Sequence, residues 1–344
     1  MTTIERVLRV LEENRGIPQS GEAIAESLAL SRTAVWKAVK NLREAGYEIN
    51  AKPKKGYYLP QASDILSKEA VEAQLEQIWL NDMGESFGET MKPVSLHIQV
   101  EKEVTSTNRE LSARAIHGAP SGSVLITGVQ TSGKGHRDHR FSSPEGGLYM
   151  SVMLRAEDLM YEKIPQITAA GALAVRRAVK DVTGEELSIR WVNDLYLHRK
   201  KVCGILTEGA VDLESGQLQW IVLGIGINYR TRPQDYPEEI RDKVGSLYGD
   251  QRTDKEIPPR ARLAAAILRE LFIQPPDAKE LMQEYMQYLD QKGKEITVTP
   301  IQRGKEVYGK SYQAVLLGVD EKMHLLVNVD GNQQELGFGQ VSIS

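Results

Sequence analysis

A glycine-rich, cationic stretch at residues 130–141 is the part of the sequence best suited to binding an anion. It has the sequence Gln-Thr-Ser-Gly-Lys-Gly-His-Arg-Asp-His-Arg-Phe. Glycines let backbone N–H groups approach an anion closely, and the lysine and two arginines can neutralise phosphate charge. The G-x-x-x-x-G-K-[ST] spacing of a Walker A loop is absent. Taken alone, the stretch is compatible with a phosphate-binding loop or with a flexible surface loop.

Three later segments also contain polar or glycine residues that could contact a ligand. Asn193 and Asp194 follow an apolar segment, where they can cap a turn, hold Mg²⁺ or contact a ligand hydroxyl. Lys201 opens a second apolar segment, a position at which a lysine is usually solvated. The stretch 224–228, Gly-Ile-Gly-Ile-Asn, lacks the third glycine of a dinucleotide-binding fingerprint. These segments therefore remain ambiguous without further context.

The histidines and the cysteine argue against a dedicated metal centre. His136 and His139 have no third ligand at suitable spacing, and the single cysteine, Cys203, excludes a zinc site made of thiolates. One cysteine cannot form an internal disulfide, which favours a reducing, cytoplasmic compartment. No signal peptide is expected, because no apolar stretch follows the first charged residues. We therefore assign no metal site.

The length and charge distribution indicate several domains, one of which suits nucleic acid. A chain of 344 residues is too long for one ordinary core and predicts two or three domains. The net charge is −4, yet residues 31–60 contain seven lysines and arginines against two glutamates. A basic patch on an acidic protein favours DNA binding over a merely solvated surface.

The first 60 residues predict three helices followed by a two-stranded wing. The third helix starts after Ser31, which can cap it, and ends near Gly46. The basic turn Lys52-Pro53-Lys54-Lys55 joins the two strands and suits phosphate contacts. Trp36 could contact a thymine methyl group, but packing against the first helix is the favoured interpretation. The predicted DNA-binding residues are Ser31, Arg32, Thr33, Lys37, Lys40, Lys54 and Lys55.

The rest of the chain predicts an α+β fold with a mixed sheet. Short turns at residues 198–200 and 214–216 split adjacent strands and indicate antiparallel pairing. Strands are predicted at Leu96–Val100, Val124–Gln130, Leu148–Leu154, Ile189–Val192, Leu195–Leu197, Val202–Glu208 and Leu218–Ile227. Helices are predicted at Ser67–Trp79, Arg109–His117, Pro165–Val182, Pro259–Phe272 and Ala278–Leu289. Residues after 295 predict a small β-barrel.

In combination, these motifs resemble the bifunctional biotin–protein ligases that also repress the biotin operon. The resemblance covers nearly the whole chain: the winged helix, residues 105–108, 133–141, 190–194, 201–204 and 224–228. It implies a winged helix-turn-helix at 1–62, a linker helix and loop at 63–93, a mixed-sheet ligase domain at 94–290 and an SH3-like barrel at 291–344. Lipoate ligases share the catalytic fold but typically lack the N-terminal domain.

The resemblance also implies roles for individual residues. Lys201 and Lys134 would be catalytic, stabilising developing negative charge. The implied biotin-binding residues are Ser106, Thr107, Asn108, Gln130, Lys134, Gly135, His136 and Lys201. The implied adenylate-binding residues are Gly133, Arg137, Phe141, Asn193, Asp194 and Asn228.

The implied activity is ATP-dependent biotinylation coupled to transcriptional repression. MgATP and biotin would form biotinyl-5′-AMP, and the biotin would pass to a lysine of a carboxylase carrier domain. The adenylate-bound protein would form a homodimer that binds operator DNA. Two alternatives remain: a ligase whose N-terminal domain no longer regulates, and a sensor without catalysis. His136 and His139 replace two arginines usual in the family, so we expect weaker phosphate binding by this loop.

Overall fold

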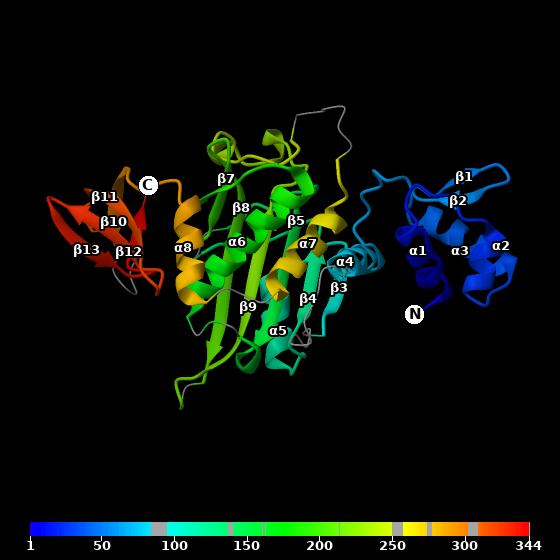
Figure 1. Ribbon diagram of the computed structural model, residues 1–344, viewed down its shortest axis with the longest axis horizontal. Helices are drawn as coiled ribbons and strands as arrows, with labels where there is room; N and C mark the ends of the chain where they lie inside the picture. The colour runs from blue at the N-terminus through cyan, green and yellow to red at the C-terminus, as the bar shows by residue number, and fades with distance from the viewer. Residues whose placement is uncertain are drawn as a thin grey trace.

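Three bodies follow one another along the long axis of the molecule (Figure 1). An N-terminal winged helix is joined to a central sheet covered by helices, and a smaller sheet lies at the other end. The computed structural model describes residues 1–83, 95–136, 140–159, 161, 163–212, 214–249, 257–273, 277–301 and 309–343. Among these residues, no helix combines the length and apolar character needed to cross a membrane.

The winged helix forms as the sequence predicts. Ser20 and Ser31 cap the second and third helices by accepting hydrogen bonds from backbone N–H groups three residues on. Gly56 begins the second strand at φ +109°, and a Cβ there would lie 1.9 Å from the carbonyl oxygen of Gln19, so only glycine fits. The elements are α1 (Thr3–Glu13), α2 (Gly21–Ser27), α3 (Arg32–Glu44), β1 (Asn50–Lys52) and β2 (Gly56–Tyr58).

The central sheet has seven strands in the order β3-β4-β5-β9-β8-β7-β6. β3 and β4 are parallel, and the other neighbouring pairs are antiparallel, which confirms the mixed sheet. The turns at residues 198–200 and 214–216 join antiparallel neighbours as predicted. The strands are β3 (His97–Glu101), β4 (Ser123–Thr127), β5 (Leu148–Arg155), β6 (Ser188–Arg190), β7 (Asp194–Leu197), β8 (Lys200–Val211) and β9 (Leu218–Ile227).

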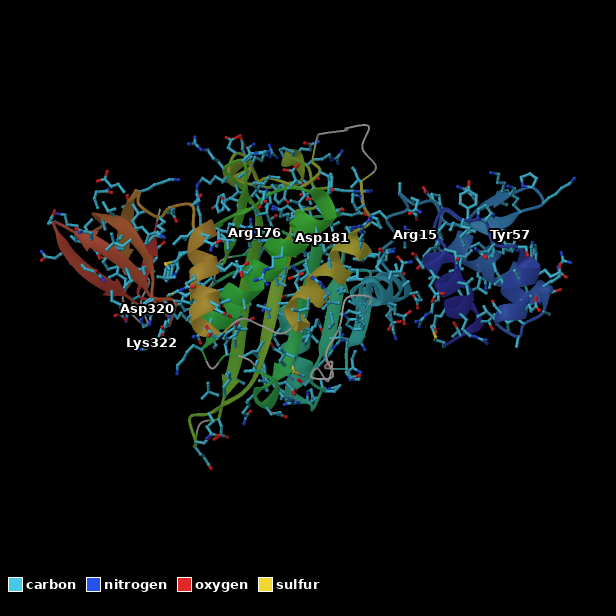
Figure 2. All side chains as sticks on the ribbon, viewed as in Figure 1. Arg15, Tyr57, Arg176, Asp181, Asp320 and Lys322 are labelled. Atoms are coloured by element: carbon cyan, nitrogen blue, oxygen red, sulfur yellow. The ribbon has the colours of Figure 1, made fainter. Side chains whose placement is uncertain are left out.

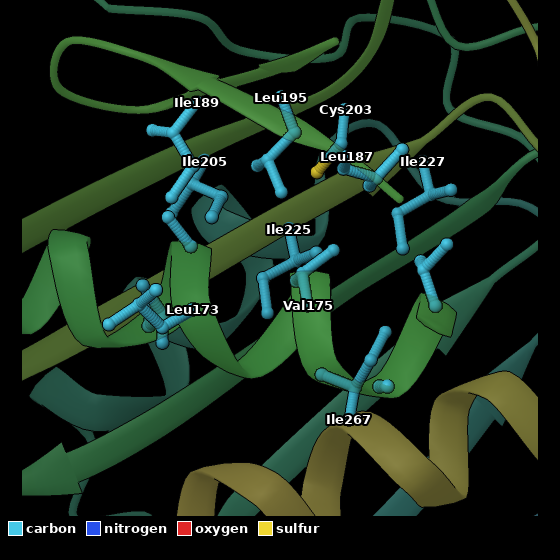
Figure 3. Packing of buried hydrophobic residues seen from close by; sticks show 14 of the residues in the cluster. Leu173, Val175, Leu187, Ile189, Leu195, Cys203, Ile205, Ile225, Ile227 and Ile267 are labelled. Atoms are coloured by element: carbon cyan, nitrogen blue, oxygen red, sulfur yellow. The ribbon is translucent and has the colours of Figure 1, made fainter. Parts of the chain in front are cut away.

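The helices cover the two faces of this sheet unequally. One face packs on α4 (Lys68–Met83), α6 (Ile164–Thr183) and α7 (Arg260–Phe272). Figure 3 shows aliphatic side chains of the sheet, α6 and α7 meeting around Val175 and Ile225. The other face packs on α5 (Thr107–Ile116) through Leu111 and Ala115. Because α5 covers only part of its face, the rest of that face is available for a binding site.

The C-terminal body is an antiparallel sheet in the order β13-β12-β11-β10-β14. The predicted SH3-like barrel is not confirmed, because no ladder joins the edge strands β13 and β14 among the described residues. The side chains of β13, Asn-Gln-Gln-Glu-Leu, are largely exposed, so this strand has little apolar surface with which to close a barrel. The elements are α8 (Ala278–Tyr288), β10 (Glu295–Pro300), β11 (Tyr312–Val319), β12 (Leu325–Val329), β13 (Asn332–Leu336) and β14 (Val341–Ile343).

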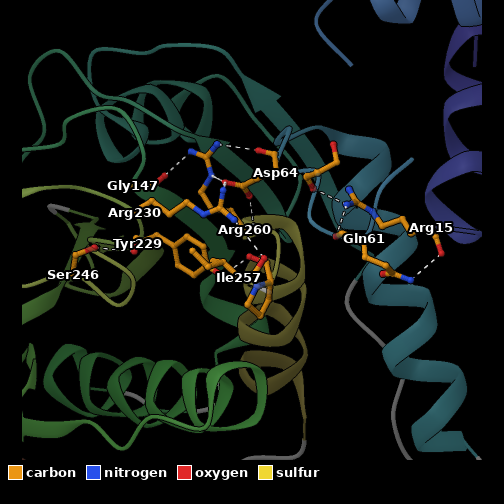
Figure 4. Close-up of polar contacts among 11 residues, drawn as sticks. Arg15, Gln61, Asp64, Gly147, Tyr229, Arg230, Ser246, Ile257 and Arg260 are labelled. Atoms are coloured by element: carbon orange, nitrogen blue, oxygen red, sulfur yellow. Dashed lines mark hydrogen bonds and ion pairs between the residues drawn. The ribbon is translucent and has the colours of Figure 1, made fainter. Parts of the chain in front are cut away.

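The winged helix is attached to the central body by a chain of polar contacts. Arg15, labelled at this junction in Figures 2 and 4, is buried and donates to Glu12 (2.5 Å) and to the carbonyl oxygen of Ser63 (2.6 Å). Next along the chain, Asp64 accepts hydrogen bonds from the backbone N–H (2.6 Å) and the Nε (3.0 Å) of Arg260. These contacts link α1, the connecting segment and α7.

Candidate functional site

A pocket of about 350 Å³ lies on the face of the central sheet beside α5. Along β9, Ile221, Leu223, Ile225 and Ile227 pack into the core under α6 and α7. The alternate residues point to the other face, since successive strand residues alternate. Gly224 and Gly226 occupy two of these positions and line the pocket, and their lack of side chains lets neighbouring groups approach the sheet closely.

A chain of hydrogen bonds forms the polar wall of the pocket. The Gln130 side-chain oxygen accepts from the Thr107 backbone N–H at 2.8 Å, which is one of the donors left free at the start of α5. The Ser151 hydroxyl lies 2.7 Å from the Thr107 hydroxyl and 2.6 Å from the Asn108 side-chain oxygen. Ser106 caps α5. The wall thus consists of buried, mutually oriented groups that can recognise a small polar ligand.

Gly224 is required for this wall. A Cβ at residue 224 would lie 2.0 Å from the Asn108 side-chain oxygen. Asn108 in turn donates to Glu208 at 3.0 Å, and Glu208 also pairs with Lys134. The glycine therefore lets α5 approach the sheet closely. Asn108 connects the polar wall to the cationic loop, the glycine-rich stretch at residues 130–141.

The cationic loop folds back on itself as a hairpin over the pocket. The Phe141 backbone N–H donates to the Gly133 carbonyl at 3.0 Å. The backbones of Lys134 and Arg140 pair as an isolated antiparallel β-bridge. Ser143 receives a hydrogen bond from the Gln130 side chain at 2.8 Å, which ties the loop end to the polar wall. Predicted residues Arg137 and His139 lie outside the described residues.

The aromatic ring that ends the loop lies against two facing glycines of the sheet. Gly204 and Gly226 are register partners on β8 and β9. A Cβ at either would come within 2.8 Å or 2.5 Å of the Phe141 ring, respectively. The Lys201 ammonium lies 5.9 Å from the centre of that ring. The ring therefore positions both the loop and the lysine at the sheet surface.

Lys201 and Asp194 form an ion pair at the pocket. Their closest atoms are 2.6 Å apart, and both side chains are about a quarter to a third exposed. The Asn193 side chain donates to the Ile205 carbonyl at 2.7 Å, which holds the backbone next to Asp194 in place. A cation and a carboxylate at one corner suit a phosphorylated ligand that arrives with its own Mg²⁺. Among the described residues, the one group of three possible metal ligands lies elsewhere, at Asp320, His324 and Glu335.

The C-terminal body supplies a wall that the sequence analysis missed. Phe338 lies with its ring centre 5.1 Å from that of His136 and 6.1 Å from that of Trp191. The Trp191 indole N–H donates to the Met323 carbonyl at 2.9 Å, which fixes the two bodies against each other. No motif marks Phe338, and only its aromatic character in a glycine-rich turn could have drawn attention to it.

Most of the predicted ligand-binding residues converge on this pocket. Gly133 and Asn228 do not line it. Gly133 closes the loop hairpin, and buried Asn228 donates to the Gly245 carbonyl at 2.9 Å. The predicted residues that line the pocket are Ser106, Thr107, Asn108, Gln130, Lys134, Gly135, His136, Phe141, Asn193, Asp194 and Lys201.

Cys203, next to the pocket lysine along the chain, is a core residue. It is fully buried in the hydrophobic cluster, and burial raises the pKa of its thiol well above the ordinary value. A protonated, inaccessible thiol is a poor nucleophile, so Cys203 has a packing role.

A second candidate site is the outer face of α3. The buried face of this helix carries Val35, Ala38, Val39 and Leu42. The predicted DNA-binding residues Ser31, Arg32, Thr33, Lys37, Lys40, Lys54 and Lys55 are all exposed. Trp36 is 54% exposed, so the favoured interpretation that it packs against the first helix is wrong. Its position on the helix lies outside the buried stripe, on the edge of the polar face.

Comparison with known protein families identifies two regions. Residues 100–228 match the biotin/lipoate A/B protein ligase family. Residues 3–58 match a family described as HTH domain. The first match contains the polar wall, the cationic loop and Lys201, and the second contains α1 to β2.

Several relatives match much of the chain. The chain is 34% identical over 229 residues to the bifunctional ligase/repressor BirA of Bacillus subtilis, a match covering 66% of this chain and 65% of that protein. It thus spans slightly less than two thirds of that relative. The match to BirA of Escherichia coli is 28% identical over 332 residues and covers 94% and 92% of the two chains.

Solved structures share the fold over about seven tenths of the chain. The biotin protein ligase of Aquifex aeolicus, solved in complex with biotin and ATP, is 27% identical to this chain with a TM-score of 0.57. The match covers 72% of this chain and 97% of that protein. A point mutant of the same ligase, solved in complex with biotin, gives a TM-score of 0.58 at 26% identity and covers 71% of this chain and 97% of that protein.

Proposed function

The chain carries a domain of the biotin/lipoate A/B protein ligase family behind an N-terminal HTH domain, and on this premise we propose that it is a biotin–protein ligase and a biotin-responsive transcriptional repressor. The observation that carries the ligase assignment is the joint position of the polar wall, the cationic loop and the Lys201–Asp194 corner around one pocket. The exposed basic face of α3 carries the repressor assignment.

The first proposed step activates biotin. A biotin carboxylate oxygen attacks the α-phosphorus of ATP, a bond to that phosphorus forms, and pyrophosphate leaves. Lys201 and Lys134 stabilise the negative charge that develops on the phosphate oxygens. The polar wall of Ser106, Thr107, Asn108 and Gln130 holds the uncharged part of biotin. Asp194 and Asn193 lie at the corner where Mg²⁺ bound to the nucleotide would find a carboxylate ligand.

The second proposed step transfers biotin to a carrier. The ε-amino group of a lysine on a carboxylase carrier domain attacks the carbonyl carbon of biotinyl-5′-AMP, an amide bond forms, and AMP leaves. Until then the anhydride must be kept from water. The loop hairpin and Phe338 both line the pocket, and the Phe338 ring contacts His136 of the loop, which suits them to this role.

Regulation follows if the adenylate-bound chain forms a homodimer that presents two copies of α3 to operator DNA. Binding of the adenylate would then raise DNA affinity through the dimerisation equilibrium. A cytoplasmic location fits both a carboxylase substrate and a DNA target.

One experiment separates the proposal from its alternatives. The protein is incubated with biotin, MgATP and a carrier domain, and DNA binding is then measured with and without biotin. Both labelling and biotin-dependent DNA binding are expected. Labelling without DNA binding indicates a ligase that does not regulate, and DNA binding without labelling indicates a sensor without catalysis.

Variants of adjacent lysines test the assignment of the pocket. Lys201→Ala should lower adenylate formation by at least about 100-fold, since it removes a preorganised charge next to the reacting phosphate. Lys200→Ala is the matched control, because Lys200 is exposed and does not line this pocket. Near-normal turnover of Lys201→Ala would contradict the assignment.

A further inference from the structure

Trp36 is an exposed aromatic residue on a helix that otherwise presents small and charged side chains. It is 54% exposed, whereas Val35 beside it is completely buried. A large aromatic on a protein surface leaves apolar area in water and often marks a contact site. The fold of the winged helix does not require this indole, because the core of this body is made by residues on another face of α3.

The neighbours of Trp36 indicate which kind of partner it meets. With 3.6 residues per turn, Thr33, Lys37 and Lys40 lie on the same side of α3 as Trp36. The Lys40 ammonium lies 6.0 Å from the centre of the indole ring. A face that combines cations with one flat apolar group is complementary to DNA, whose phosphates attract the lysines and whose bases offer apolar edges.

The position of Trp36 along the helix favours contact with a base over contact with the DNA backbone. In helix-turn-helix proteins, residues near the N-terminus of the second helix contact base edges in the major groove. Trp36 is in the second turn of α3, which begins at Arg32. The apolar group that the major groove displays is the C5-methyl of thymine.

We propose that Trp36 is a specificity-determining residue whose indole packs on a thymine methyl group in the major groove of the operator. This inference rests on the proposed repressor function and adds the base that this residue recognises. Lys37 and Lys40 contact DNA phosphates and contribute affinity that does not depend on the base sequence. Loss of the methyl contact should weaken binding about fourfold. This factor is the free energy of burying one carbon group, converted to a ratio of dissociation constants.

The test uses the full chain with biotin and MgATP. Bound duplexes are first selected from a random library, and each thymine of the selected sequence is then replaced by deoxyuridine, which lacks only the methyl group. Wild-type protein should bind about fourfold more weakly when the contacted thymine is replaced. With Trp36→Ala this penalty should disappear, and with Trp36→Phe part of it should remain.

Lys37→Ala provides the matched control on the same face. It should weaken binding to all sequences and lower the salt dependence, while the deoxyuridine penalty persists. The inference is overturned if Trp36→Ala retains the wild-type penalty, or if no deoxyuridine replacement affects wild-type binding. If no duplex is selected, the repressor function itself fails, and the inference fails with it. A change in oligomeric state without any change in DNA affinity would assign Trp36 to a protein contact instead.

Discussion

Gly226→Ala should release the cationic loop from the sheet. The added Cβ would lie 2.5 Å from Cε1 and 2.9 Å from Cζ of Phe141. Carbon atoms prefer to be about 3.5–4.0 Å apart, so the ring would have to retreat by roughly 1 Å. Phe141 closes the hairpin through its hydrogen bond to Gly133, and moving the ring therefore disturbs the loop that covers the pocket.

The size of the effect follows from the cost of overpacking. Inserting a methyl group into a well-packed site typically costs about 1–3 kcal/mol. If adenylate binds only with the loop closed, its apparent affinity falls by the same factor as the closed population, about fivefold to 150-fold. Gly204→Ala should have a smaller effect, because its Cβ would approach the other side of the ring only to 2.8 Å.

Equilibrium binding of biotinyl-5′-AMP and its release rate measure the effect. Urea denaturation, followed by circular dichroism, shows whether the fold is intact. Gly209→Ala on β8 is the control, since its Cβ would meet the flexible end of Leu218 at 2.9 Å, and it should bind adenylate normally.

A double-mutant cycle with Phe141→Ala tests the explanation itself. Once the ring is gone, Gly226→Ala should cost less than about twofold in adenylate affinity, because the clash has been removed. If Gly226→Ala is equally harmful with and without the ring, the clash with Phe141 is not the cause, and the role assigned to this glycine is wrong.

Three further perturbations test other parts of the structure. Phe338→Ala should speed adenylate release by about twofold to tenfold, since it removes an aromatic partner of the loop; the exposed Val315→Ala on the same sheet is the control, and equal release rates would refute the role. His136→Arg should tighten adenylate binding or slow its release, because arginine is always charged, and no change in either quantity would contradict the expectation. Burial raises the pKa of Glu12 above 4.5, so the folded state holds this proton more tightly than the unfolded state. The free energy of unfolding should therefore fall as pH rises past the ordinary carboxyl pKa toward the raised pKa of Glu12, and Glu12→Gln should remove that slope. An unchanged slope in urea denaturation would show that another group is responsible.

Features determined by local sequence were predicted well. The serine cap and the start of α3 depend on residues within one turn, so Ser31 marks them directly. The antiparallel turns of the central sheet are local in the same way. Most of the residues carried over from the ligase resemblance lie around one pocket, because they occur in motifs with ordered spacing.

Features determined by distant contacts were missed or predicted wrongly. Phe338 reaches the pocket only because the C-terminal sheet docks against Trp191, and nothing near Phe338 in the sequence indicates this. Tryptophan is usually buried, which favours packing of Trp36, yet its helical position places it outside the buried stripe of α3. The predicted barrel is not confirmed, because turn signals identify hairpins but do not determine whether edge strands meet.

The polar junction at Arg15 and Asp64 has a consequence for the spacing of operator half-sites. Because contacts of Arg15 and Asp64 join the winged helix to α7, the winged helix moves as one rigid body with the central sheet and is not attached by a flexible linker. In the proposed dimer, the two winged helices would therefore be held at one fixed distance from each other. B-DNA repeats about every 10 base pairs, so inserting about 5 base pairs turns one half-site to the opposite side of the duplex. Such a protein would tolerate few changes in the number of base pairs between half-sites, however well each half-site matched its recognition helix.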